Sequence, residues 1–250
     1  MSAEDDREEG LLSHLLELRT RLLKAVIAVV VVLVALLPFA QRLYTWLAQP
    51  LVSKLPAGSQ LVAIEVASPF FAPIKLAFFV AIVLAMPLVL YQLWAFVAPG
   101  LYRHERRLAT PLLVSAMLLF YGGVAFAYFL VLPTVFGFLT AVTPADVAMM
   151  TDISRYLDFV MVLFLAFGAS FEVPVAVVIL AALGVVDIPQ LKAARGYVVV
   201  GAFVVAAVLT PPDVVSQLLL AIPMCLLYEA GIIAARFVRP RSVDADAAAS

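Results

Sequence analysis

Six long stretches of this chain carry almost no charge, and they limit its possible folds more than any other feature. A charged group near the centre of a bilayer costs about 3 kcal/mol, and a helix needs about 20 apolar residues to cross. The composition agrees, since 65% of the residues are hydrophobic and the mean hydropathy is +1.11. The sequence therefore predicts an all-α integral membrane protein with six transmembrane helices, over residues 22–40, 73–93, 111–132, 156–183, 197–209 and 214–236.

The last two apolar stretches form a predicted helical hairpin with a short first arm. Only Thr210-Pro211-Pro212-Asp213 separates them, and the paired prolines end one helix while Asp213 is placed to cap the next. The arm over 197–209 rises roughly 20 Å, whereas the hydrocarbon core is about 30 Å thick. Either the bilayer is thinner there or the tip of the hairpin is buried in protein.

Basic residues are distributed unequally between the two sets of predicted loops. Twelve of them lie near the two termini and in the loops around residues 103–107 and 192–195, against Arg42, Lys54 and Arg155 on the other side. The positive-inside rule therefore predicts that both termini are cytoplasmic. With no internal repeat or linker, residues 1–240 are expected to form a single polytopic domain, followed by a short disordered tail over 241–250.

The connection over residues 41–72 is too long and too apolar for a solvated loop. It includes Pro50 and Phe70, and its Tyr44 and Trp46 are typical of the membrane interface. We expect a partly helical cap that lies along the outer face.

Glu172 is a carboxylate near the middle of the fourth predicted span. Such groups are costly in a membrane and usually face protein or a water-filled cavity. Pro174 favours a kink that opens a polar pocket beside it. A structural role, in which a protonated Glu172 bonds to another helix, is equally consistent with the pattern. Gln217, in the sixth span, either faces lipid or a partner or forms an intrahelical or interhelical hydrogen bond.

Two further glutamates lie among basic residues at the predicted cytoplasmic surface. Glu17 precedes Arg19, and Glu105 lies in Leu101-Tyr102-Arg103-His104-Glu105-Arg106-Arg107. Carboxylates on a partly desolvated surface can bind guanidinium groups in a bidentate manner, which favours arginine over lysine. The simpler interpretation is that each glutamate neutralises its basic neighbours on a solvated face.

Several classes of function lack their usual residues. Acidic and basic residues nearly balance, so nucleic acid is not an expected partner. The single cysteine, Cys225, and the two distant histidines predict no metal site, and no cofactor-binding motif is present. Without a nucleotide-binding loop, a serine elbow or a histidine inside a span, we do not expect an enzyme.

Five ordered motifs closely resemble the TatC family, the polytopic subunit of the twin-arginine protein translocase. They are Glu17-Leu18-Arg19, the segment 66–71, the segment 91–107 from Tyr91-Gln92-Leu93-Trp94 onward, Ser170-Phe171-Glu172-Val173-Pro174, and Thr210-Pro211-Pro212-Asp213. The similarity extends from about Leu12 to Phe237. It implies a curved, glove-like arrangement of six helices with short fifth and sixth helices, in the bacterial inner membrane.

The resemblance also implies a function and its residues. The family binds the twin-arginine signal peptide of folded cargo at the cytoplasmic face, and it assembles with the single-span subunits TatA and TatB for export driven by the proton motive force. We also expect self-association within the receptor complex and contact with the phospholipid membrane. By match of motif, the signal-binding residues are Glu17, Arg19, Phe96, Tyr102 and Glu105. Glu172 and Gln217 are the intramembrane polar residues, while Pro50, Phe70 and Asp213 belong to outer-face or partner-contact elements.

Two other functions are compatible with the residues alone. A secondary transporter could use Glu172 for proton coupling, although it usually has inverted repeats and a second intramembrane ionisable group. A purely structural membrane scaffold makes no demand on Glu17 or Glu105. Binding of a twin-arginine peptide separates the receptor from both.

Overall fold

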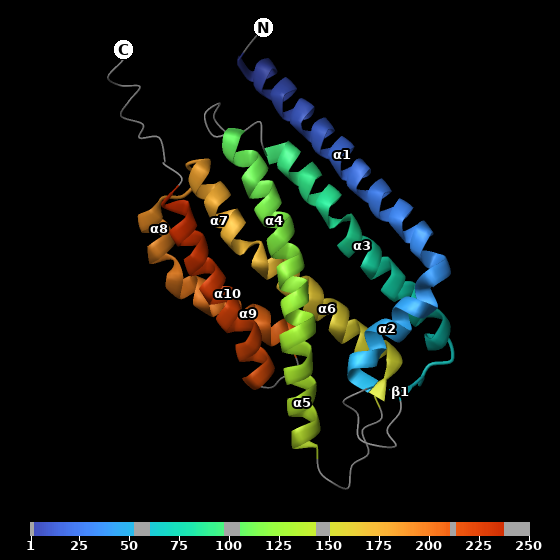
Figure 1. Ribbon diagram of the computed structural model, residues 1–250. Coiled ribbons are helices and arrows are strands. Elements are labelled where there is room, and N and C mark those ends of the chain that lie inside the picture. The colour runs from blue at the N-terminus through green and yellow to red at the C-terminus, as the bar shows by residue number, and fades with distance from the viewer. Residues whose placement is uncertain (1–2, 53–60, 98–105, 144–150, 211–213, 238–250) are drawn as a thin grey trace.

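The computed structural model describes residues 3–52, 61–97, 106–143, 151–210 and 214–237, and almost all of these are helical (Figure 1). The all-α prediction is confirmed. In chain order the helices are α1 (Ala3–Leu36), α2 (Ala40–Val52), α3 (Ser68–Val97), α4 (Arg106–Phe126), α5 (Leu132–Val142), α6 (Ile153–Phe171), α7 (Val173–Ala182), α8 (Ile188–Ala193), α9 (Arg195–Leu209) and α10 (Val214–Ala235).

The structure has two distinct ends (Figure 1). The start of α1, the end of α3, the start of α4 and the end of α10 lie together at one end, which we call the terminal end. The helix α2 and the end of α5 lie at the other, which we call the loop end. There a two-residue strand, β1 (Leu61–Val62), pairs in parallel with β2 (Thr151–Asp152).

Five helical segments of the described chain are long and apolar enough to cross a membrane, so this is a multi-pass membrane protein. They are Leu16–Leu47, Ser68–Phe96, Thr110–Val142, Ile153–Ala182 and Val214–Ala235. The fifth predicted segment corresponds to α9, which has 15 residues and rises about 22 Å, so the fifth helix is short as predicted. The expectation of a short sixth helix holds only relative to the others, because α10 has 22 residues, enough for about 33 Å.

The helical segments extend beyond the apolar windows read from the sequence, most clearly in the third. The predicted window over 111–132 ends just before Pro133, a residue that lacks the N–H needed to continue an α-helix. In the structure a π-helical turn, η3 (Ala127–Val131), lies at this point and the chain continues helically as α5. The wider turn absorbs the proline at the start of α5 without ending the segment.

The predicted cap over residues 41–72 is helical in part. A 3₁₀ turn, η1 (Leu37–Phe39), joins α1 to α2, so the chain remains helical to Val52. The Tyr156 hydroxyl donates a hydrogen bond to the Leu47 carbonyl at 3.1 Å and ties α2 to α6.

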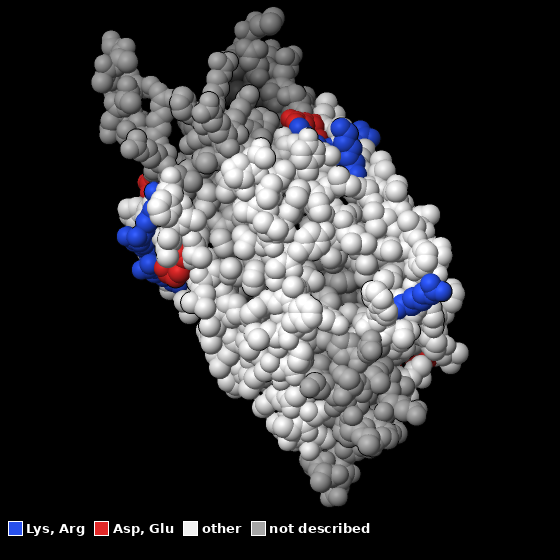
Figure 2. All heavy atoms as spheres, in the orientation of Figure 1, with Lys and Arg blue, Asp and Glu red and all other residues white. Residues whose placement is uncertain are grey.

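The helix α6 lies at the centre of the bundle. Ten of its residues are buried, and it packs against α3 and α4, whereas α7 packs against α10. By contrast, α1 packs mainly against α3 and exposes most of its apolar side chains. Figure 2 shows a broad uncharged face with charged side chains gathered near its margins. Such a surface is expected where lipid, not water, is the solvent.

Candidate functional site

The terminal end of the bundle brings together three of the residues that the resemblance assigns to signal binding. Glu17 and Arg19 lie on α1, and Phe96 lies near the end of α3. A cavity of about 120 Å³ separates the two helices here; Leu18, Arg21, Leu22 and Ala25 line it from α1, and Gln92 and Phe96 line it from α3. The site is therefore an apolar recess with one carboxylate beside it.

Arg21 is the residue that contacts Glu17. Its Nη2 and Nε donate hydrogen bonds to Glu17 Oε1 at 2.6 and 2.9 Å. Both side chains are only partly exposed, at 24% for Arg21 and 36% for Glu17. The sequence interpretation singled out Arg19, which is exposed, and missed Arg21. The four-residue spacing was a visible signal, because side chains at i and i+4 lie on the same face of a helix.

Glu105 and Tyr102 lie outside the described residues, as does Asp213. The helix ends that flank Glu105 and Tyr102, those of α3 and α4, lie at the terminal end with the start of α1 (Figure 1).

Glu172 lies where the fourth predicted span is interrupted, as Pro174 suggested. The helix α6 ends at Phe171 and α7 begins at Val173. The Glu172 N–H donates to the Ala169 carbonyl at 3.1 Å, and its carbonyl accepts from the Ala176 N–H at 2.9 Å. The side-chain Oε1 is buried and forms no hydrogen bond with the described residues. The structural role, in which Glu172 bonds to another helix, therefore finds no partner for Oε1 among the described residues.

Glycines allow other helices to approach this break closely. A Cβ atom at Gly123 of α4 would lie 2.5 Å from the Phe167 carbonyl oxygen, so α4 and α6 meet at close range. A Cβ atom at Gly231 of α10 would lie 2.9 Å from Pro174 Cα. Glu172 is thus held between two close helix crossings, and movement of either helix would change its surroundings.

Gln217 joins the two arms of the hairpin. Its Nε2 donates to the Phe203 carbonyl at 3.3 Å, which connects α10 to α9. This is an interhelical hydrogen bond of the kind that the structural interpretation expects.

Two of the residues assigned to the outer face lie in elements at the loop end. Pro50 is part of α2, and Phe70 lies in the first turn of α3 with 66% of its surface exposed. The Phe70 ring meets Phe71 edge to face, with 5.2 Å between the ring centres. Exposed aromatic side chains at a helix end are typical of the membrane interface.

Polar contacts that the sequence did not reveal surround Asp152 at the loop end. This carboxylate caps α6 by accepting the N–H groups of Ser154 and Arg155, each at 3.0 Å, and it also accepts the Ile64 N–H at 3.1 Å. The N–H groups of Arg155 and Ile64 lower the pKa of Asp152, because they stabilise its charged form. No cluster of three or more potential metal-ligating side chains occurs in the described ranges.

Comparisons with known proteins place this arrangement in a family. The family model of the Sec-independent protein translocase protein TatC matches residues 13–223. The chain belongs to the TatC family. Its relatives include the Sec-independent protein translocase proteins TatC of Escherichia coli strain K12, 56% identical with 95% of this chain and 91% of the relative covered, and of Azotobacter chroococcum, 54% identical with 95% and 93% covered.

A solved TatC structure has the same fold. The crystal structure of a twin arginine translocase receptor, TatC, superposes on this chain with a TM-score of 0.80 at 37% identity, covering 90% of this chain and 99% of the other. The chain is accordingly a TatC component of Sec-independent protein translocation.

Proposed function

We propose that this TatC-family protein is the receptor for the twin-arginine signal peptide of folded precursor proteins at the cytoplasmic face of the bacterial inner membrane. The observation that carries the proposal is the position of Glu17, a partly exposed carboxylate beside an apolar recess between α1 and α3. A peptide that combines arginine with apolar side chains is complementary to such a surface. The similarity in fold and sequence to a twin arginine translocase receptor of known structure supports the same conclusion.

The geometry of Arg21 suggests how a ligand arginine binds. Arg21 donates both of its hydrogen bonds to Oε1 of Glu17, and no described residue donates to Oε2. A guanidinium group from the signal peptide can therefore approach Oε2 while Arg21 keeps the carboxylate oriented. Because the guanidinium has several donors in one plane, it can use this oxygen and a second acceptor together, which an ammonium group does less well. By the family motif, Glu105 supplies the second carboxylate, with Arg19, Phe96 and Tyr102 around it.

Assembly with TatA and TatB forms the second part of the proposal. The exposed side chains of Val200, Val204 and Val208 lie four residues apart along α9, so they form one apolar stripe. This stripe offers a docking surface for a single-span helix next to the hairpin. We infer that Pro50, Phe70 and Asp213 contribute to contacts at the outer face, and that copies of the chain associate in the receptor complex, where the proton motive force drives export.

The proposed topology follows the same logic. We infer six membrane crossings that include α9, in a curved, glove-like form with both termini in the cytoplasm. The unequal loop charges and the shared position of the start of α1 and the end of α10 support this orientation. Residues 1–240 then form one polytopic domain, and the predicted tail over 241–250 lies outside the described residues.

A binding assay tests the receptor proposal. A fluorescent twin-arginine peptide is titrated against the purified protein in detergent, with Glu17→Gln and the Glu17→Gln/Glu105→Gln double variant. Loss of a charge-assisted hydrogen bond is expected to weaken binding roughly 10- to 100-fold. Glu229→Gln is the matched control, since Glu229 also pairs with an arginine, Arg195, at 2.6 Å but lies on α10. A twin-lysine peptide should bind poorly; undiminished binding to the double variant would refute the proposed roles.

Glu172 is proposed to act after signal binding. We expect Glu172→Gln to bind the twin-arginine peptide normally but to impair a later step such as partner assembly. Crosslinking from α10 to the partner subunits, measured with peptide bound, reports that step. Equal loss of peptide binding and partner crosslinking would contradict the separation.

A further inference from the structure

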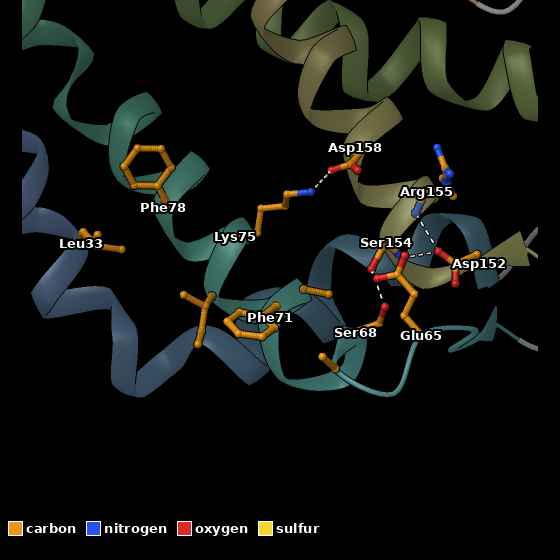
Figure 3. Close-up of a pocket in the computed structure, with 13 residues that line it drawn as sticks. Leu33, Glu65, Ser68, Phe71, Lys75, Phe78, Asp152, Ser154, Arg155 and Asp158 are labelled. Atoms are coloured by element: carbon orange, nitrogen blue, oxygen red, sulfur yellow. Dashed lines mark hydrogen bonds and ion pairs between the residues drawn. The ribbon is translucent and has the colours of Figure 1, made fainter.

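A second and larger cavity lies at the loop end, away from the proposed signal site. It has a volume of about 590 Å³, within the usual range for ligand pockets, and opens between α1, α3 and α6 (Figure 3). One wall is apolar and is formed by Leu33 of α1 with Phe71 and Phe78 of α3. The other carries charged side chains from the segment before α3 and from the start of α6.

A salt bridge in this cavity lies inside the apolar segments. Lys75 of α3 pairs with Asp158 of α6, and their side chains are 52% and 45% exposed (Figure 3). Counted from the starts of their helices, Ser68 and Ile153, the two residues lie about 8–10 Å into the bundle. Since the headgroup layer is about 5–7 Å thick on each side, the pair lies near the boundary with the hydrocarbon. Half-exposed charges at that depth require a polar group to cover them.

Three further charged residues line the cavity: Arg155, Glu65 and Asp152, whose carboxylate already accepts three backbone N–H groups. Neither Arg155 nor Glu65 forms a salt bridge within the described residues, although both are exposed and border the same space. The hydrogen bond between the Ser154 and Ser68 hydroxyls, at 3.0 Å, holds the starts of α6 and α3 together beneath them. Apart from the capping carboxylate of Asp152, the cavity thus presents one unpaired cation and one unpaired anion beside an apolar wall.

We propose that this cavity binds a phospholipid with a zwitterionic phosphoethanolamine headgroup. The phosphate faces Arg155 and Lys75, the primary ammonium donates to the carboxylate of Glu65, and an acyl chain lies against Phe71 and Phe78. Charge complementarity selects the occupant, since an anionic headgroup leaves Glu65 unpaired and a quaternary ammonium has no N–H to donate. The proposal is independent of signal-peptide binding.

Native mass spectrometry of the full chain in detergent tests this assignment. The protein is titrated with dioleoyl phosphatidylethanolamine, phosphatidylcholine and phosphatidylglycerol, and the lipid retained is counted for each. Glu65→Gln is expected to weaken retention of phosphatidylethanolamine roughly fivefold and to leave phosphatidylglycerol unchanged, whereas Arg155→Gln weakens both. Arg42→Gln is the matched control, because Arg42 is an exposed arginine of α2 that does not line the cavity.

Three results would overturn the proposal. The first is equal retention of the three lipids by the unmodified protein. The second is a loss in Glu65→Gln or Arg155→Gln no greater than in Arg42→Gln. The third comes from a photo-crosslinker placed at position 78 in membranes: labelling of a polypeptide instead of lipid would assign the cavity to a partner helix.

Discussion

The contact between α4 and α6 makes a sharp prediction about two adjacent glycines. A Cβ atom at Gly123 would lie 2.5 Å from the Phe167 carbonyl oxygen and 3.0 Å from Phe171 Cγ, whereas one at Gly122 would lie 4.0 Å from Phe171 Cδ1. To bring the Gly123→Ala contact to the 3.4 Å at which ordinary contacts begin, the two helices must separate by about 0.9 Å. Gly122→Ala requires no movement and is the matched control.

The free-energy difference between these variants can be estimated from the same distances. Overpacking of a core costs about 1–3 kcal/mol, while replacing glycine by alanine in a helix gains up to about 1 kcal/mol. Gly123→Ala is therefore expected to lower the free energy of unfolding by about 1–2 kcal/mol, and Gly122→Ala to leave it unchanged or raise it. For a chain of this length, each kcal/mol corresponds to roughly 2–4 °C in the midpoint of thermal unfolding.

Tryptophan fluorescence during heating measures both variants in detergent. Trp94 is 6% exposed and packs in a buried cluster with Phe120 of α4 and Val175 of α7, so it reports on this part of the bundle. If Gly123→Ala unfolds at the same temperature as Gly122→Ala or above it, α4 and α6 do not make the close backbone contact described here.

Three further predictions concern other sites. Arg21→Gln should alter twin-arginine peptide affinity more than Arg19→Gln does, because Arg21 donates two hydrogen bonds to Glu17; equal effects in the peptide titration would contradict this. Asp152→Asn should lower the unfolding temperature at neutral pH. The difference from the unmodified protein should shrink as the pH falls through the lowered pKa of Asp152, because the unmodified side chain then becomes neutral as well. A difference in unfolding temperature that stays constant from pH 7 to pH 3 would be evidence against this role. Gly231→Ala should weaken the packing of α10 against Pro174, seen as faster proteolysis of the C-terminal helix, with Gly201→Ala, where a Cβ atom meets nothing within 4 Å, as control.

Much of the fold was predictable from the sequence, because a membrane simplifies the problem. The cost of charge in hydrocarbon placed the apolar helices, and Pro174 placed the break at Glu172. The helical segment extends beyond the window over 111–132, because a π turn absorbs Pro133 without ending the segment. The short α9 followed directly from the length of its apolar window.

The candidate site was predictable only in part. Charged residues at one predicted surface and the ordered motifs identified Glu17 and Phe96 as neighbours, and the recess between α1 and α3 agrees with that grouping. The contact between Glu17 and Arg21 was missed, although its four-residue spacing was visible. The contact between Lys75 and Asp158, 83 residues apart, had no sequence signal, since neither residue is part of a motif.

By itself, the sequence determined which segments can enter a membrane, where the fourth segment breaks and which family motifs are present, because these depend on transfer free energies and on local backbone chemistry. Only the tertiary structure decided which helices meet. In lipid, the burial of apolar surface does not favour one pairing of helices over another. The pairing therefore depends on where small residues such as Gly123 and Gly231 allow two helices to approach closely. That packing leaves Glu172 between two crossings, the recess beside Glu17 at one end and the charged cavity around Lys75 at the other.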